Sequence, residues 1–417
     1  MHPAPTPDTI ASSPRITLAL TLSVLMSKPP AQRLRKFRFN TPQRIAVILL
    51  LMFVTQSYFL IGANPPTPQD TFIATCGSHI WTTASLSSNI TFNPAACPQM
   101  PEGVLAYRAA GLPLAIHNWL ASQAADAEPS NLFLTLSSLA ALIRLPFLLA
   151  GLGLGACLWW VTRRLFGDPG GYIALGLYCF TPPVILNASF PNNGILAAFG
   201  LFAAVYTAIG VAHAMQGPRR KWRKRIILLA VTLGFTASAS PAAFLLAILI
   251  GIPLLTWLAE ERRKYVPLLT LIAVAGALLI FLAAHGFQWA AFGLFLHLWP
   301  TSIHFAHLPG MALNFSTAPI RIALLAAIIG YAALRRARYF GNTTPLWISA
   351  LLILLALAAV TPAGWLWTIP FLLTFLGGVA ADLLESRVRV PFAFLCGILL
   401  ITQALISISS LATLSPS

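Results

Sequence analysis

The stretch that decides the fold is AALIRLPFLLAGLGLGACLWWVTRRLFGDPGGYIALGLYCFTPPVILNASFPNNGILAAFGLFAAVYTAIGVAHAM, residues 140–215. It holds three apolar runs. The basic residues Arg163 and Arg164 separate the first two runs, and a polar turn at 191–193 separates the last two. A hydrocarbon core of about 30 Å takes roughly 20 residues of helix, and lipid offers backbone groups no hydrogen-bond partner. Each run therefore predicts a membrane-spanning helix.

The composition of the chain is that of an integral membrane protein. Of its 417 residues, 58% are hydrophobic and 9% are charged, whereas a soluble domain has about 25% charged residues. The net charge of +16 comes from short basic clusters between apolar runs. This pattern sets membrane orientation, with basic loops in the cytoplasm, and disfavours a nucleic-acid-binding surface. The clusters are 33–44, 163–164, 219–225, 262–264, 335–338, and Arg387 with Arg389.

The same criteria predict an all-α protein of about eleven transmembrane helices, with its N-terminus in the cytoplasm and its C-terminus outside. Residues 1–40 are expected to be a disordered basic cytoplasmic leader, and 41–417 one polytopic membrane domain. A long outer loop, 64–130, follows the first span and includes a helix at 103–122 that suits the membrane interface. A second outer region, 285–316, precedes the eighth span. The spans expected outside the opening stretch are 44–63, 226–237, 241–257, 267–284, 317–334, 345–361, 365–384 and 390–410.

The cysteines divide by position. Cys157, Cys179 and Cys396 lie inside apolar runs, which favours small core residues. Cys76 and Cys97 share the predicted outer loop 64–130, so we predict that they form a disulfide. The alternative is two free thiols.

Arg144 is a charge in an otherwise uncharged part of its predicted helix. Such a charge costs several kcal/mol unless it faces protein or water. Gly151 and Gly155 follow seven and eleven positions later, which places all three within roughly 20° of one helix face. Small residues at this spacing form a packing face, so Arg144 is predicted to point into the bundle. There it either binds an anionic ligand or caps carbonyls and pairs with a neighbour.

Two further features on the outer side suit a phosphate at headgroup depth. The helix that begins at Asn193 has its N-terminus there, with Asn192 or Asn193 as the cap, and free N–H groups at such an end attract anions. Arg321 lies one turn into a helix that enters from outside. Arg144, Arg321, Asn192 and Asn193 are therefore candidate lipid-phosphate ligands, with snorkelling to the headgroups as the alternative for Arg321.

Acidic residues are scarce on the outer side. Asp70 follows the first span closely and is a candidate general base for an acceptor hydroxyl, the alternative being a solvated loop aspartate. His304 and His307 lie three apart, but their segment has no carboxylate or cysteine. Interfacial histidines are favoured there over a zinc site. No metal ligands or certain cofactor are assigned, and a divalent metal is left open.

The run RLPFLLAGLGLGACLWWVTRRLFGDPGG, followed by ALGLYCFTPPVILNASF, resembles the GT-C superfamily of membrane glycosyltransferases, which includes protein O-mannosyltransferases and lipid A aminoarabinose transferases. The resemblance implies transfer of a sugar from a polyprenyl-phosphate carrier to a hydroxyl acceptor on the outer face. It also implies that Asp70 is the catalytic acid or base and that Arg144 helps to hold the carrier phosphate. Two acidic motifs of the family are missing. Thr71 follows Asp70 with no glutamate nearby, and Asn192 stands where relatives often have an acid.

The sequence therefore supports two hypotheses. The first is a GT-C-like glycosyltransferase of a bacterial inner membrane whose partners are a polyprenyl-phosphate-linked sugar and membrane lipids, with no nucleic acid. The second, motivated by the missing acids, is a catalytically inactive protein of the same fold that binds or transports the lipid carrier.

Overall fold

The computed structural model describes residues 41–82, 103–123, 132–218, 220–287, 317–334, 365–385 and 389–414, and these form helices and turns without strands. By its contacts the chain divides into two units, Met1–Arg44 and Ile45–Ser417. The second unit contains the packing and the candidate site.

Seven helices among the described residues are long and apolar enough to cross a membrane, so the chain is a multi-pass membrane protein. Outside the opening stretch, five of them lie where the sequence predicts spans: α2 (Thr41–Ala63), α9 (Pro241–Leu258), α10 (Val266–Ala284), α15 (Trp365–Leu384) and α16 (Arg389–Leu414). The shorter α13 (Ala318–Leu334) is also at its predicted place. The leader 1–40, the predicted span 345–361 and most of the second outer region lie outside the described residues. The count of about eleven spans stays a prediction.

The first two runs of the opening stretch form α5 (Leu132–Cys179), which reverses at Gly167. Gly167 has a φ of 83°, a left-handed conformation that a residue without a Cβ adopts at no steric cost. The two halves then pack together, since the hydroxyl of Tyr178 donates to the carbonyl of Gly151 at 2.6 Å. The predicted basic turn between these runs is confirmed, three residues after Arg164.

The predicted second span is not one continuous helix. It is interrupted between α5 and α6 (Pro182–Ser189), because proline at the start of α6 has no N–H to continue the ladder. The break frees the carbonyls of Cys179 and Phe180. The side-chain amide of Gln56 in α2 donates to the first, and that of Gln403 in α16 donates to the second. Side-chain amides from two other helices thus satisfy backbone groups that lipid could not.

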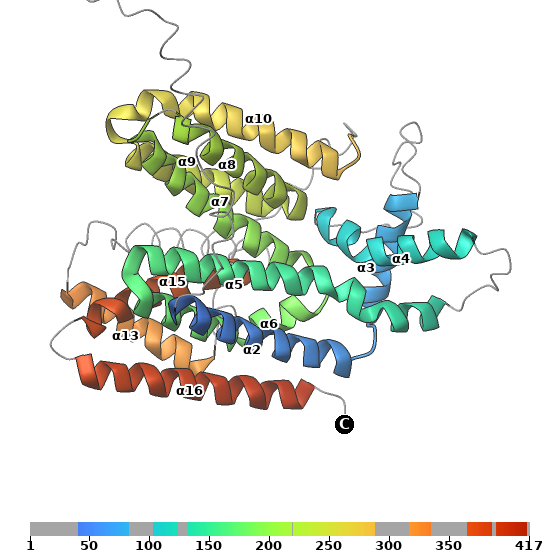
Figure 1. Ribbon diagram of the computed structural model, residues 1–417, viewed down its shortest axis with the longest axis horizontal. Helices are drawn as coiled ribbons and strands as arrows, with labels where there is room; N and C mark the ends of the chain where they lie inside the picture. Colours follow the sequence, from blue (N-terminus) through green and yellow to red (C-terminus); the bar gives the residue numbers. More distant parts are fainter. Residues whose placement is uncertain are drawn as a thin grey trace, which may run out of the picture. The chain divides into compact units, whose positions relative to one another are not determined.

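α7 (Asn193–Met215) is the centre of the bundle. It packs against α8 (Arg220–Ala239) and α9 (Pro241–Leu258) on one side and against α5 and α15 on the other. In Figure 1, α8, α9 and α10 form one layer, and α2, α5, α13, α15 and α16 lie beyond α7. α7 and α15 are mostly buried and α16 mostly exposed, as expected for a lipid-facing edge helix.

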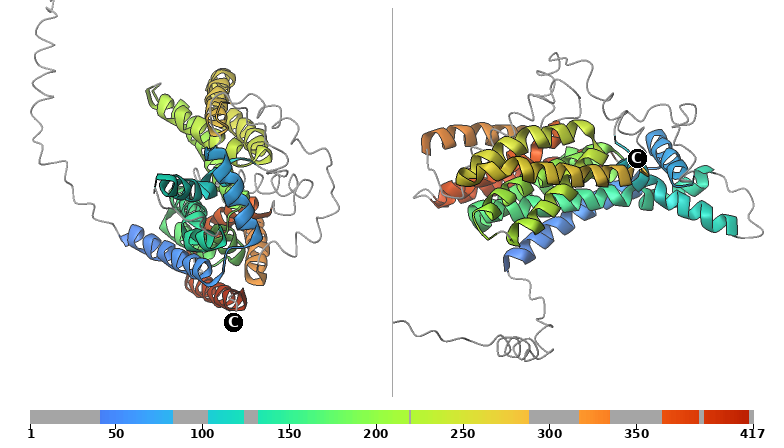
Figure 2. Two further views of the ribbon diagram at one scale, coloured as in Figure 1. Left: turned by 90° about the vertical axis from the view of Figure 1, so that its right-hand side faces the viewer. Right: turned by 90° about the horizontal axis from the view of Figure 1, so that it is seen from above.

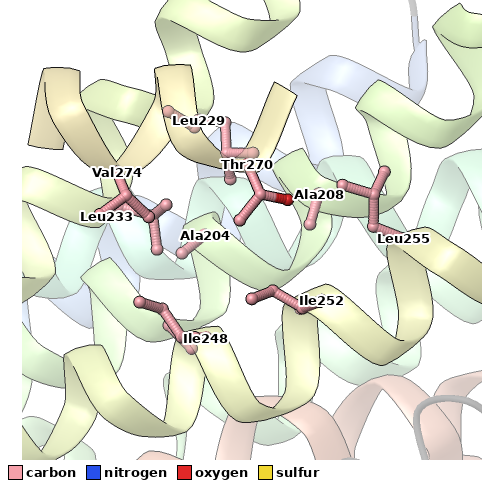
Figure 3. A pocket seen from close by; sticks show the side chains of 12 residues that line it. Ala204, Ala208, Leu229, Leu233, Ile248, Ile252, Leu255, Thr270 and Val274 are labelled. Carbon is pink, nitrogen blue, oxygen red and sulfur yellow. The ribbon is translucent and has the colours of Figure 1, made fainter. Parts of the chain in front are cut away.

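Small side chains allow α7, α8, α9 and α10 to pack closely. Figure 3 shows the narrow apolar crevice left between them, about 20 Å³ in volume. Only a single water would fit there. The hydroxyl of Thr270 has no hydrogen-bond partner among the described residues. The lining residues are Ala204, Ala208, Leu229, Leu233, Ala247, Ile248, Gly251, Ile252, Leu255, Thr270, Ala273 and Val274.

The predicted outer loop 64–130 contains a helical hairpin of α3 (Pro68–Thr82) and α4 (Leu105–Gln123). The helix expected at 103–122 is therefore present, whereas α3 was not foreseen. The two helices lie side by side at the end of the bundle where α2 ends (Figures 1 and 2). They cross with their backbones in contact, because a Cβ added at Gly111 would lie 2.1 Å from the carbonyl carbon of Gly77.

Gly111→Ala is expected to destabilise the protein by about 3 kcal/mol or more, because the added methyl meets backbone atoms that cannot rotate away. Gly62→Ala is the matched control. A Cβ at Gly62 meets nothing within 4 Å, so that variant should be neutral or slightly more stable. The unfolding midpoints of both variants in mixed detergent micelles give the comparison. Equal midpoints would show that the hairpin can open at this crossing without cost.

Cys157, Cys179 and Cys396 are free thiols. Cys179 is a buried core residue as predicted, whereas Cys157 and Cys396 are half-buried and pack against the core. Cys76, in α3, is disulfide-bonded. Cys97 lies outside the described residues, so the pairing of Cys76 with Cys97 stays a prediction.

Candidate active site

Asp70 belongs to the first turn of α3 and not to an irregular loop. Its backbone N–H donates to Oγ1 of Thr67 at 3.1 Å, and its Oδ2 accepts from the N–H of Thr67 at 3.1 Å. This reciprocal pair is a capping box, with Pro68 at the first helical position, where proline is favoured. The sequence Thr67-Pro68-Gln69-Asp70 carries this signal and would have predicted the start of α3.

Arg144 in α5 is fully buried, as its spacing from Gly151 and Gly155 predicts. Its Nε and one terminal N–H donate to Oδ2 of Asp70 at 3.1 and 2.5 Å. Three more N–H bonds go to the carbonyls of Ile61, Asn64 and Pro65, at 3.0, 2.8 and 2.9 Å. A guanidinium has five N–H donors, so all are used.

The pair therefore fixes three elements together. Arg144 belongs to α5, its carbonyl acceptors end α2, and Asp70 begins α3. Both side chains are removed from solvent, with exposures of 1% and 5%. The ring of Phe190, which follows α6, lies 4.8 Å from the guanidinium carbon of Arg144. A buried ion pair needs its remaining hydrogen bonds satisfied to offset desolvation, and here the arginine's are.

Asp70 also lines an open cavity of about 370 Å³, here named the Asp70 cavity. Its Oδ2 is held by Arg144 and Thr67, whereas its Oδ1 accepts no hydrogen bond from the described residues. One carboxylate oxygen is thus fixed and the other is left for a ligand. The cavity is lined by Thr67, Gln69, Asp70, Leu186, Asn187, Phe190, Pro191 and Asn192.

The N-terminus of α7 forms part of this cavity through Asn192. The Oδ1 of Asn192 accepts from the N–H of Ile195 at 3.2 Å, which confirms a cap at this helix start. Its Nδ2 donates to the carbonyls of Asn187 and Phe190, both at 2.7 Å. Asn193 is buried beside it, and its Oδ1 has no hydrogen-bond partner within the described part of the chain.

The structure brings together some of the predicted site residues and not others. Asp70 and Asn192 line one cavity, and Arg144 lies directly behind Asp70. Arg321, in α13, is exposed and does not line it. Gln69 and Asn187 also line the cavity. The sequence around Asn187 contains no motif that indicates a site. Asn187 lies at the cavity because of the turn that follows α6.

A metal-ligand set is not evident in the described residues, where no three histidine, cysteine or acidic side chains gather. Among the described residues that line the cavity, Asp70 is the one carboxylate. His304 and His307 lie outside the described residues, so their interfacial assignment stays a prediction.

A second polar cluster surrounds Arg108 in α4. The guanidinium carbon lies 5.0 Å from the ring of Trp81, whose Nε1 donates to the carbonyl of Arg108 at 2.8 Å. Burial lowers the pKa of Arg108. Burial also lowers the pKa of His285, and the charge of Arg108 lowers it further, against a hydrogen bond to Phe281 that raises it. In this cluster the neutral form of the His285 imidazole is therefore favoured.

No protein-family model matches the sequence, and no curated protein is similar to it in sequence. Solved structures match in fold. The apo structure of ArnT from Cupriavidus metallidurans aligns with a TM-score of 0.54 and 14% identity, over 87% of this chain and 62% of ArnT. ArnT bound to undecaprenyl phosphate aligns with a TM-score of 0.53 and 12% identity, over 88% and 70%. The Archaeoglobus fulgidus oligosaccharyltransferase in complex with Zn and sulfate aligns with a TM-score of 0.53 and 14% identity, over 89% and 53%.

This chain spans less than two thirds of the apo ArnT and oligosaccharyltransferase chains. ArnT is an aminoarabinose transferase, and both proteins are GT-C enzymes. At these identities the likeness concerns the fold. The chain has the fold of the GT-C membrane glycosyltransferases, as the resemblance of its opening stretch predicts.

Proposed function

We propose that this protein transfers a sugar from a polyprenyl-phosphate carrier to a hydroxyl acceptor at the outer face of a bacterial inner membrane, with its N-terminus in the cytoplasm. The observation that carries the proposal is the Asp70 carboxylate. One of its oxygens is fixed by a buried arginine, and the residue lines an open cavity.

Asp70 is proposed as the general base. Its Oδ1 takes the proton of the acceptor hydroxyl, whose oxygen attacks the anomeric carbon of the sugar. The bond from that carbon to the carrier phosphate breaks, and the phosphate leaves with the bonding electrons. A base within hydrogen-bond reach of the hydroxyl is the geometric requirement. The hydrogen bonds that Oδ2 accepts from Arg144 and Thr67 restrain rotation of the Asp70 carboxylate. Its Oδ1 is therefore held in one orientation for the acceptor hydroxyl.

The carrier phosphate is proposed to bind beside Asn192, at the N-terminus of α7. The positive end of the helix dipole favours an anion there, and the side chain of Gln69, which also lines the cavity, supplies an amide donor. All five donors of Arg144 are occupied in this conformation. Its contribution is therefore to position Asp70, and direct phosphate binding by Arg144, Arg321 or Asn193 stays a prediction.

The comparisons support the choice of carrier at the level of fold. One of the similar structures, ArnT, was solved with undecaprenyl phosphate bound. The Asp70 cavity lies beside the first outer helix after the first span, which suits a carrier whose phosphate stays at headgroup depth.

Gln69→Glu tests the phosphate position. Gln69 is exposed, and its side chain makes no hydrogen bond within the described residues, so the variant should fold. The new charge is expected to weaken binding of undecaprenyl phosphate at least about tenfold by repulsion across a few ångström. Native mass spectrometry of the purified full chain, titrated with the lipid, measures the change.

Asn118→Asp is the control, because Asn118 is exposed on α4 and does not line the cavity. It makes the same amide-to-acid change and should leave carrier binding as it is. Equal affinities for Gln69→Glu and the wild type would place the phosphate elsewhere.

The second candidate is a protein of this fold that binds the carrier without catalysis. It is favoured because the described residues that line the cavity include no second acid beside Asp70. It predicts carrier binding that responds to Gln69→Glu, but no sugar transfer by the wild type.

A further inference from the structure

A second cavity lies at the other end of the bundle. α7 begins at the Asp70 cavity and runs 23 residues to Met215, so the turn that follows it is at the opposite end. There it meets the 3₁₀ helix η2 (Glu260–Tyr265), which connects α9 to α10. Between them is a cavity of about 440 Å³, here named the basic turn cavity. It is lined by Gly217, Pro218, Trp222, Glu261, Arg262, Lys264 and Tyr265.

The walls of this cavity are held by contacts between the two turns. Arg262 donates to the carbonyl of Gly217 at 3.0 Å, and Nε1 of Trp222 donates to the same carbonyl at 3.3 Å. The guanidinium carbon of Arg262 lies 5.5 Å from the ring of Trp222, and that ring packs edge-on against Tyr265. The shape of the cavity is therefore held by specific side-chain contacts between the two turns.

The two cations that line the cavity, Arg262 and Lys264, have hydrogen-bond donors that are not used by described residues. The bond to Gly217 is the one hydrogen bond that the side chain of Arg262 makes to described residues, so four of its five side-chain N–H donors stay available. The ammonium of Lys264 is exposed and lies 5.4 Å from the ring of Tyr265. Neither forms an ion pair within the described residues. Glu261 also lines the cavity, and its carboxylate disfavours a small, highly charged anion.

We propose that the basic turn cavity binds the phosphate group of an anionic lipid headgroup that also carries hydroxyls. Arg262 and Lys264 bind the phosphate, and Glu261 accepts hydrogen bonds from the hydroxyls. The cavity lies between α9, a candidate span that ends at Leu258, and α10, which begins at Val266 within the next candidate span, Glu260–Ala284. Tryptophan and tyrosine at such a level, beside Lys and Arg, are typical of a headgroup site.

The site is independent of the Asp70 cavity, so either proposal can fail alone. The probe is phosphatidylglycerol added to the full chain purified in a mild detergent, with phosphatidylcholine and inorganic phosphate in parallel, read by native mass spectrometry. Lys264→Gln leaves the hydrogen bond between Arg262 and Gly217 in place and is expected to weaken phosphatidylglycerol binding about fivefold. Adding Arg262→Gln should extend the loss beyond tenfold.

The control is Arg223→Gln with Lys224→Gln, which removes two exposed charges on α8 that do not line the cavity. A loss confined to the cavity variants, with phosphatidylglycerol bound in preference to phosphatidylcholine, supports the proposal. If inorganic phosphate displaces the lipid at millimolar concentration, the phosphate site stands but its ligand is free phosphate. Equal losses in the cavity and control variants, or none in either, overturn the site.

Discussion

Replacing Arg144 with methionine is expected to lower the free energy of unfolding by about 3–5 kcal/mol, because removing one partner of a buried ion pair leaves the other charge unpaired. The Asp70 carboxylate would keep only the N–H of Thr67, and the carbonyls of Ile61, Asn64 and Pro65 would lose their donor. Adding Asp70→Asn to this variant is expected to recover about 1–3 kcal/mol, since the unpaired charge is then gone. Unfolding of the wild type, the two single variants and the double variant in mixed micelles completes the cycle.

The same helix provides the control. Arg163 pairs with Asp168 near the reversal of α5, but their side chains are 33% and 43% exposed. The corresponding cycle of Arg163→Met and Asp168→Asn should show a coupling below about 1 kcal/mol, as exposed pairs do. If both cycles gave the same small coupling free energy, Arg144 and Asp70 would not stabilise each other. The proposed role of Arg144 in positioning Asp70 would then be wrong.

Asp70→Asn alone is expected to reduce sugar transfer by about 10²–10⁴-fold, the usual contribution of a general base. Asparagine keeps the size of the side chain and an oxygen for the capping box, but it cannot take a proton from the acceptor. Carrier binding should persist, because the phosphate is proposed to bind at Asn192. The measurement is release of polyprenyl phosphate from a panel of polyprenyl-phosphate sugars by the reconstituted full chain.

Asp168→Asn is the control for this prediction, because it removes a half-exposed carboxylate outside the Asp70 cavity. Native mass spectrometry on the same samples separates loss of chemistry from loss of fold, since an unfolded variant would also lose the carrier. Transfer that continues unchanged in Asp70→Asn would remove the proposed base. A wild type that binds the carrier but transfers no sugar from any donor would favour the non-catalytic binder.

Much of the architecture was readable from the sequence because lipid imposes strong rules on the chain. The lengths of the apolar runs predicted the positions of α2, α7, α10, α15 and α16, since a span needs about 20 apolar residues. The pattern could not reveal the break before Pro182. Composition does not show that Gln56 and Gln403, distant in sequence, supply the donors that make such a break tolerable in a membrane.

By itself the sequence determined that the chain spans a membrane, that α5 reverses near its basic turn, and that Arg144 faces the interior. The first two follow from apolar length and from the basic residues between the first two runs, and the third from helical spacing and the cost of charge in lipid. Only the tertiary structure decided what Arg144 does there. Its five donors are filled by Asp70 and by the end of α2, elements that are 74 to 83 residues away. The cost of a charge in lipid shows from sequence alone that Arg144 needs polar partners. Which partners it has is decided by the packing of α2, α3 and α5 against one another.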